Sequence, residues 1–230
     1  MKLANKVVAI TGAFGNLGAA VAEAVAEQGA RLALIDRAAP IADQIQGDVL
    51  RMGGINLSVA AEAQTAIAKT ADHFGRLDAL INIAGTFRWE TLEGGSLDTW
   101  DFLYNVNLKT AVATSKAALP HLLQSRGRIV NIGAGVAVTK ASAGMGAYAA
   151  SKAGVIKLTE ALSEEVKDRG MTVNAILPSV IDTPQNRTDM PTADFSRWVT
   201  PKAIADVIVF LLSDEAQAIT GASIPVSGRA

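Results

Sequence analysis

Short apolar runs alternate along the chain with longer amphipathic stretches. The runs are nearly continuous rather than alternating with polar residues, which is typical of strands buried on both faces of a parallel sheet. In the longer stretches, small apolar residues recur at helical spacing. We expect strands at 7–11, 31–36, 77–85, 127–133, 171–178 and 222–226, and helices at 17–28, 59–74, 98–124, 148–169 and 201–213.

This order of elements predicts a single α/β domain over residues 1–230, with a Rossmann-like, doubly wound parallel sheet and helices on both faces. The length is sufficient for one large core, and no stretch rich in Pro, Gly or Ser divides the chain. Ligands bind beyond the carboxyl ends of the strands in such sheets. Two segments expected there, 86–100 and 183–200, are therefore predicted substrate loops.

Composition narrows the classes of function. A net charge of −1 offers no basic surface for nucleic acid or an acidic membrane. The chain has no cysteine and only two separated histidines, so we predict no metal site. The apolar run Val7–Ile10 is too short for a signal peptide or a membrane span, which favours a cytoplasmic protein.

A glycine-rich turn joins the first expected strand to the first helix. Gly12, Gly15 and Gly18 have the spacing G-x-x-G-x-x-G, with Asn16 and Leu17 in the same turn. Backbone N–H groups at such a turn and at a helix N-terminus can hold a pyrophosphate, which a Cβ would obstruct. This spacing alone is weak evidence for a nucleotide site, so the alternative is a glycine turn that binds no ligand.

A carboxylate at the end of the second expected strand strengthens the nucleotide hypothesis. Asp36 lies 18 residues after Gly18, where a carboxylate binds a ribose diol. The same charge repels a 2′-phosphate, so NAD(H) is favoured over NADP(H). Arg37 follows directly and weakens this preference.

Tyr148 and Lys152 lie four residues apart in the segment GMGAYAASKAG. Residues at i and i+4 of a helix are neighbours, so the phenol and the ammonium can act together. The alternative is a core tyrosine beside a solvated lysine.

These residues resemble the short-chain dehydrogenase/reductase family over nearly the whole chain. The motifs follow in the family's order, and the set is more specific than any one of them. They are Thr11-Gly12…Gly18, Asn56-Leu57-Ser58 (with Asn56 in place of the usual Asp), Asn82-Ile83-Ala84-Gly85, Asn107, Tyr148-x-x-x-Lys152, and Pro178 with Thr183.

The resemblance implies a dinucleotide-dependent oxidoreductase acting on a small-molecule substrate. Tyr148 would transfer the proton, Lys152 and an oxidised nicotinamide would favour the phenolate, and Asn107 would hold a water that resupplies the proton. The cofactor-binding residues would be Gly12, Gly15, Asn16, Leu17, Gly18, Asp36, Asn56, Leu57, Asn82, Ala84, Gly85, Tyr148, Lys152, Pro178 and Thr183.

The family's catalytic serine is absent. The segment that should carry it contains Gly133, Ala134 and Gly135, and the spacing of Thr139 and Ser142 does not match. Loss of such a donor to a developing alkoxide costs roughly a few kcal/mol of transition-state stabilisation. The protein is therefore either a weak ketone reductase or acts on a substrate that does not need the serine.

Several segments resemble the dihydropteridine reductases, family members that lack this serine. They include LPSVIDTPQNRTDMPTADFSRW at 177–198, Gly133-Ala134 and Gly144-Met145. The resemblance implies NADH-dependent reduction of a quinonoid dihydropterin. Two alternatives remain open: a ketone or 3-oxoacyl thioester reductase, and a dinucleotide-binding protein without turnover.

The loops and outer helices add two further expectations. Small and apolar residues on helices 98–124 and 148–169 exceed what one sheet face needs, and family members commonly pair these helices, so we expect a homodimer or homotetramer. Five loop side chains are candidates either for the substrate pocket or for simple packing: Arg88, Trp89, Arg187, Phe195 and Trp198.

Overall fold

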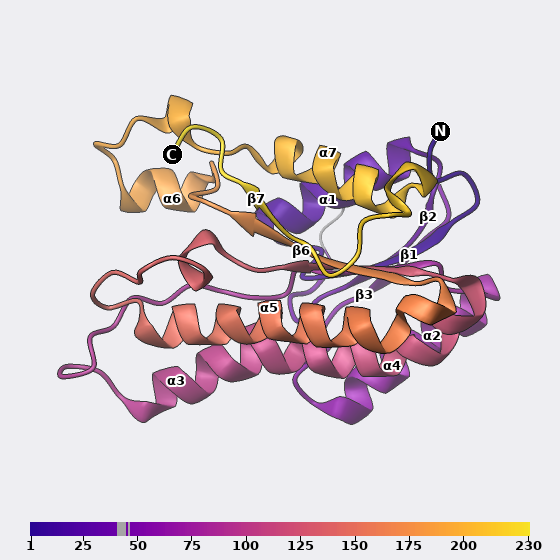
Figure 1. The fold of residues 1–230 in the computed structure, drawn as a ribbon, viewed down its shortest axis with the longest axis horizontal. Coiled ribbons are helices and arrows are strands. Elements are labelled where there is room, and N and C mark those ends of the chain that lie inside the picture. Colours follow the sequence, from indigo (N-terminus) through magenta and orange to yellow (C-terminus); the bar gives the residue numbers. More distant parts are fainter. Residues whose placement is uncertain (41–44, 46) are drawn as a thin grey trace.

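The computed structural model describes residues 1–40, 45 and 47–230. Seven parallel strands form one sheet in the order β3-β2-β1-β4-β5-β6-β7, which confirms the predicted fold class (Figure 1). The strands are β1 (Val7–Thr11), β2 (Arg31–Ile35), β3 (Val49–Met52), β4 (Ala79–Asn82), β5 (Arg128–Ile132), β6 (Thr172–Pro178) and β7 (Ser223–Val226). The α-helices are α1 (Asn16–Glu27), α2 (Ala60–Phe74), α3 (Leu97–Leu103), α4 (Thr110–Ser125), α5 (Gly146–Val166), α6 (Pro184–Asp189) and α7 (Pro201–Leu212).

Helices cover both faces of the sheet (Figure 1). Helices α1 and α7 pack on one face, and α2, α4 and α5 pack on the other. Alternate residues of β1 enter the two cores: Val8 and Ile10 join the α1/α7 side, while Val7 and Ala9 join the opposite side. Every residue of β1 is thereby buried, which explains why the strand pattern is continuous rather than alternating.

One strand was not predicted. Strand β3 pairs with β2 at the edge of the sheet, and three of its four residues are only half-buried. It contains Arg51 and lacks the long apolar run by which the inner strands are identified. An edge strand with one neighbour needs less apolar surface, so the hydrophobic pattern does not reveal it.

The helix expected at 98–124 is divided. A π-helical turn, Tyr104–Lys109, separates α3 from α4. The predicted loop 183–200 also contains the short helix α6. The Thr183 side chain accepts the N–H of Asn186 at 3.2 Å, and Pro184 occupies the first helical position. Both are favoured residues for starting a helix, so the sequence contained this signal.

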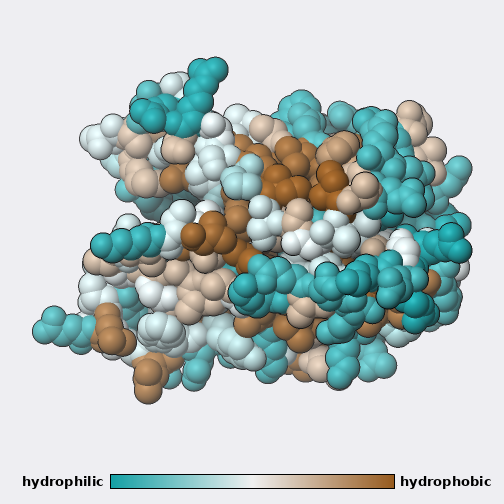
Figure 2. Space-filling model, in the orientation of Figure 1, coloured by the Kyte–Doolittle hydropathy of each residue, from teal (hydrophilic) through white to brown (hydrophobic). Residues whose placement is uncertain are grey.

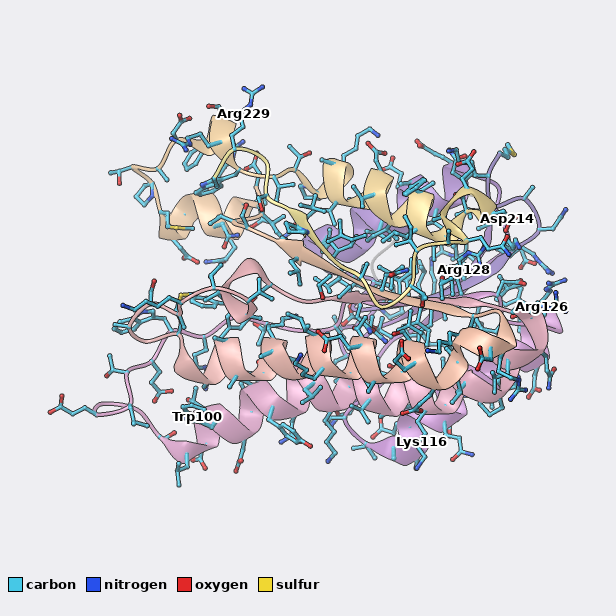
Figure 3. All side chains as sticks on the ribbon, in the orientation of Figure 1. Trp100, Lys116, Arg126, Arg128, Asp214 and Arg229 are labelled. Atoms are coloured by element: carbon cyan, nitrogen blue, oxygen red, sulfur yellow. The ribbon has the colours of Figure 1, made fainter. Side chains whose placement is uncertain are left out.

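The topology places a crevice between β1 and β4. The chain runs outward from β1 to β3 and returns beside β1 as β4, so the connections at the carboxyl ends of β1 and β4 diverge. The surface is hollowed at this end, between the α6 side and the α3 side (Figure 2). At the opposite end, the Arg128 guanidinium contacts Asp214 at 3.1 Å (Figure 3).

Candidate active site

The glycine turn between β1 and α1 is shaped by close backbone contacts. Gly12 has φ +65°, and a Cβ there would lie 2.8 Å from the Ala84 backbone. A Cβ on Gly18 would lie 2.1 Å from the Gly12 carbonyl oxygen. Both positions therefore require glycine. Ala84 and Gly12 are brought together here although they lie far apart in the sequence.

Gly15 differs from the other two glycines. A Cβ there would meet only the Gly12 carbonyl oxygen, at 3.6 Å, so the protein itself leaves room for a side chain. Gly15 is the N-cap of α1 and has no side chain with which to cap the helix. Gly15 and Asn16 are exposed, whereas Leu17 is buried beneath them. The turn thus presents first-turn N–H groups to an anion, which fits a dinucleotide pyrophosphate.

Thr11 ties this turn to the end of β4. Its hydroxyl oxygen accepts the N–H groups of Ile83 at 3.1 Å and Ala84 at 3.2 Å. Two segments of the predicted cofactor site, which are about seventy residues apart in sequence, are therefore fixed against each other.

Asp36 is held beside the same turn. One carboxylate oxygen accepts the Phe14 N–H and the other accepts the Ala38 N–H, both at 2.9 Å. Each oxygen retains acceptor capacity for a ligand hydroxyl. A fixed carboxylate next to a glycine turn fits the ribose of a dinucleotide.

Asn56 and Leu57 follow β3. The Asn56 side-chain oxygen accepts the hydroxyl and the N–H of Ser58, and the Asn56 N–H donates to Glu62 at 2.7 Å. Leu57 is buried in the core on the α2 side. The Asn56 side chain therefore bonds to its own loop.

The Asn82 amide points into the protein. Its nitrogen donates to Ser115 at 3.1 Å and to Asn131 at 2.8 Å, and its oxygen accepts the Thr114 hydroxyl at 2.7 Å. These bonds hold β4 against β5 and α4. The part of this segment that lies against the glycine turn is instead the backbone of Ile83 and Ala84.

Tyr148 and Lys152 lie one turn apart near the start of α5. The Lys152 Nζ donates to the Ile132 carbonyl oxygen at 2.7 Å, and the lysine is 5% exposed. Burial lowers the pKa of Lys152 to about 8 and raises the pKa of Tyr148 to about 12. Our expectation that Lys152 and an oxidised nicotinamide together favour the phenolate concerns the cofactor complex and stays a prediction.

Asn107 connects α5 to the segment after β4. Its side-chain oxygen accepts the Thr86 N–H at 2.8 Å, and its nitrogen donates to the Thr86 carbonyl at 3.1 Å and to Ser151 at 2.9 Å. Asn107 lies in the π-helical turn, a feature frequent at functional sites. A Cβ on Gly85 would lie 2.8 Å from the Asn107 oxygen and 3.3 Å from the Lys152 Nζ, so these two groups converge where Gly85 leaves space.

Phe87 is not among the side chains predicted from the sequence, yet it contacts Tyr148. Its ring stands edge-on to that of Tyr148, with centroids 5.0 Å apart. Trp89 donates its indole N–H to the Ala143 carbonyl at 2.9 Å. Arg88, in contrast, lies 4.6 Å above the Phe102 ring on the α3 side. Phe87 lies in the predicted substrate loop 86–100, but its contact with Tyr148 has no local signal in the sequence.

The second predicted loop packs mainly on itself. Arg187 forms a two-pronged ion pair with Asp182 and lies 4.9 Å above the Phe195 ring. Phe195 packs against Trp198 with centroids 4.8 Å apart, and Trp198 is buried. Pro178 ends β6 just before this loop.

The segment that lacks the serine lies after β5. A Cβ on Gly133 would lie 2.6 Å from the end of the Leu177 side chain, so a larger residue there would require Leu177 to move. Ala134 is buried, and the Thr139 hydroxyl donates to the Gly135 carbonyl at 3.3 Å. Thr139 therefore already has a partner within its own turn.

Among residues 1–40, 45 and 47–230, no group of three or more His, Cys, Asp or Glu side chains could hold a metal ion. Within the same ranges, every helix is too short or too polar to cross a membrane.

Comparisons with known proteins agree with this geometry. Residues 12–228 match a family model described as enoyl-(acyl carrier protein) reductase. The chain is 34% identical to 3-oxoacyl-(acyl-carrier-protein) reductase FabG of Vibrio cholerae, covering 99% of this chain and 98% of the relative. It is 33% identical to meso-2,3-butanediol dehydrogenase of Serratia marcescens, covering 100% and 96%.

The fold is also similar to that of a solved structure. The short-chain dehydrogenase/reductase from Serratia marcescens superposes with a TM-score of 0.92 at 29% identity, covering 100% of this chain and 99% of that one. The chain therefore belongs to the short-chain dehydrogenase/reductase family and is an NAD(P)-dependent oxidoreductase of that family.

Proposed function

We propose that this protein reduces a ketone or a 3-oxoacyl thioester with NAD(P)H. The observation that carries the proposal is the convergence of Lys152 and Asn107 at Gly85, one helical turn from Tyr148 and beside the glycine turn. The name of the Vibrio cholerae relative, a 3-oxoacyl reductase, supports this substrate class.

The cofactor would be held by the chain's own backbone and one carboxylate. The N–H groups of the first turn of α1, which begins at Asn16, would bind the pyrophosphate beside Gly15, and Asp36 would bind the adenosine ribose. When bound, the nicotinamide supplies or accepts the hydride. The Asp36 charge favours NAD(H) over NADP(H), because a 2′-phosphate would meet a fixed carboxylate.

Tyr148 would act as the general acid during reduction. A pKa near 12 keeps the phenol protonated at neutral pH, so it can donate to a substrate oxygen. Lys152, with a pKa near 8, lies one turn away and would stabilise the phenolate that remains. Asn107 would fix the backbone at Thr86 beside them.

A quinonoid dihydropterin is the second candidate substrate. It is favoured by the segment Gly133–Gly135, which offers no hydroxyl to a developing alkoxide. A protonated ring nitrogen would not need that donor. None of the three relatives named above carries this activity in its name, so it stands behind the ketone or thioester.

We also propose that the protein is a homodimer or homotetramer through the outer faces of α4 and α5. Tyr104 and Val112, in the π-helical turn and α4, are large apolar residues that are 52% and 40% exposed. Sedimentation of a monomer alone at micromolar concentration would contradict this assembly.

Turnover assays separate the candidates. NADH and NADPH oxidation would be followed with a 3-oxoacyl thioester, simple ketones and quinonoid dihydropterin, using wild type and Tyr148→Phe. Thioester or ketone turnover that is lost in Tyr148→Phe supports the first proposal, and turnover of pterin alone supports the second. Cofactor binding without turnover of any substrate would contradict both.

A further inference from the structure

Ser151 lies in α5 between the two residues that carry the proposed chemistry. It is buried, and its hydroxyl donates to the Tyr148 carbonyl oxygen at 2.7 Å. The same oxygen accepts the Asn107 side-chain nitrogen at 2.9 Å. Ser151 thus joins the Tyr148 helix to the π-helical turn.

The hydroxyl of Ser151 adds a third hydrogen bond to the two by which the Thr86 backbone orients the Asn107 amide. Because Ser151 uses its single hydroxyl hydrogen on Tyr148, its oxygen can only accept from Asn107. The amide nitrogen must then face Ser151, and the amide oxygen must face the Thr86 N–H. A reversed amide would place its oxygen against the Thr86 carbonyl and its N–H groups against the Thr86 N–H.

We propose that Ser151 is a positioning residue whose hydroxyl, together with the Thr86 backbone, holds the Asn107 amide in this orientation. The proposal rests on the proposed function of Tyr148 and Lys152. The amide in this orientation holds both backbone groups of Thr86, the residue before Phe87, and places the Asn107 oxygen at Gly85, which the Lys152 Nζ also approaches. Loss of the hydroxyl leaves a buried N–H of Asn107 without its acceptor.

Helix α5 supplies a matched control. Ser163 is also buried, and its hydroxyl donates to the Glu160 carbonyl at 2.7 Å, the same i to i−3 bond that Ser151 makes. It lies twelve residues further along the helix, about 18 Å away along the axis. Replacing either serine by alanine removes the same local bond, but only Ser151 supports Asn107.

The test is a double-mutant cycle with steady-state kinetics. Wild type, Ser151→Ala, Ser163→Ala, Asn107→Ala and Ser151→Ala/Asn107→Ala would be assayed with NAD(P)H and the substrate found above. We expect Ser151→Ala to lower kcat about tenfold with the cofactor KM within about twofold, and Ser163→Ala to change neither by more than about twofold. In the Asn107→Ala background, Ser151→Ala should have no further effect.

Three results would overturn the inference. The first is an unchanged kcat in Ser151→Ala, and the second is an equal loss of kcat in Ser151→Ala and Ser163→Ala. The third is a kcat in the double variant that falls below that of Asn107→Ala by the same factor that Ser151→Ala shows alone. Ser151→Thr keeps the hydroxyl and should retain more activity than Ser151→Ala. If Ser151→Ala does not fold, Ser151→Thr replaces it in the test. A kcat of Ser151→Thr close to wild type then supports the inference, and a kcat about tenfold below wild type overturns it. If Tyr148→Phe keeps its turnover, the proposed function fails instead, whatever the serine variants show.

Discussion

The ring of Phe87 stands edge-on to the phenol of Tyr148, with centroids 5.0 Å apart and planes at 86°. Phe87 is itself 53% exposed, so it shields the phenol while offering surface to a ligand. This contact helps to keep Tyr148 out of water, and burial is what raises the pKa of that phenol to about 12.

The first prediction concerns this pKa. Tyr104 is the only other tyrosine, so Tyr104→Phe leaves one phenol to titrate. By ultraviolet absorbance, Tyr148 should remain mostly protonated at about pH 10.5, where a free phenol is mostly ionised. Adding Phe87→Ala should increase the ionised fraction, because the phenol gains contact with water. Ionisation like that of free tyrosine before this substitution would contradict the burial argument.

The second prediction concerns stability. Burial lowers the pKa of Lys152 to about 8, so below that pH the fold contains a buried ammonium that water would solvate better. At pH 7 this costs up to about 3 kcal/mol. The folded protein binds fewer protons than the unfolded chain between pH 8 and about 10.5, so stability should rise with pH in that window.

Urea unfolding of wild type and Lys152→Met tests whether the free energy of unfolding rises with pH. The stability of wild type relative to Lys152→Met should increase by about 2 kcal/mol between about pH 7 and pH 9.5. Loss of the bond to Ile132 affects Lys152→Met equally at both pH values. A pH-independent difference would show that Lys152 does not titrate in this window.

The third prediction separates two glycines of the turn. Gly18→Ala places a methyl group 2.1 Å from the Gly12 carbonyl oxygen, so it should destabilise the protein by at least about 2 kcal/mol without any cofactor. Gly15→Ala meets no close atom and should cost less than about 1 kcal/mol. Its added methyl should nevertheless weaken dinucleotide binding by about tenfold or more, as measured by calorimetry. Unchanged affinity in Gly15→Ala would place the pyrophosphate elsewhere.

The fourth prediction concerns the choice of cofactor. Asp36→Asn removes the charge but keeps one oxygen for the backbone N–H groups of Phe14 or Ala38. The ratio of kcat/KM for NADPH to that for NADH should rise at least about tenfold, because a like-charge contact with the 2′-phosphate is lost. A wild-type preference for NADPH would show that Asp36 does not select the cofactor.

The inner strands and the glycine turn could be predicted because their signals are local. Continuous apolar runs mark β1 and β4, and the spacing from Gly12 to Gly18 marks the turn. Strand β3 lacked such a signal, since its four residues include Arg51 and three of them are only half-buried. The π-helical turn around Asn107 could not be predicted either, because the helical spacing of apolar residues continues on both sides of it.

Contacts between distant segments could not be predicted in the same way. Nothing in the local sequence indicates that Phe87 meets Tyr148, or that the Asn82 amide bonds inward to Asn131. The burial that raises the pKa of Tyr148 to about 12 is likewise a property of the packed structure and not of the Tyr148–Lys152 spacing. Tertiary packing decided each of these points.

Tyr148→Phe tests the central claim most directly, because it removes only the phenolic oxygen. With NAD(P)H and a substrate that wild type turns over, the account predicts that kcat falls at least about a hundredfold while the dissociation constant of the cofactor stays within about threefold. A kcat in Tyr148→Phe within about threefold of wild type would contradict the assignment of Tyr148 as the proton donor.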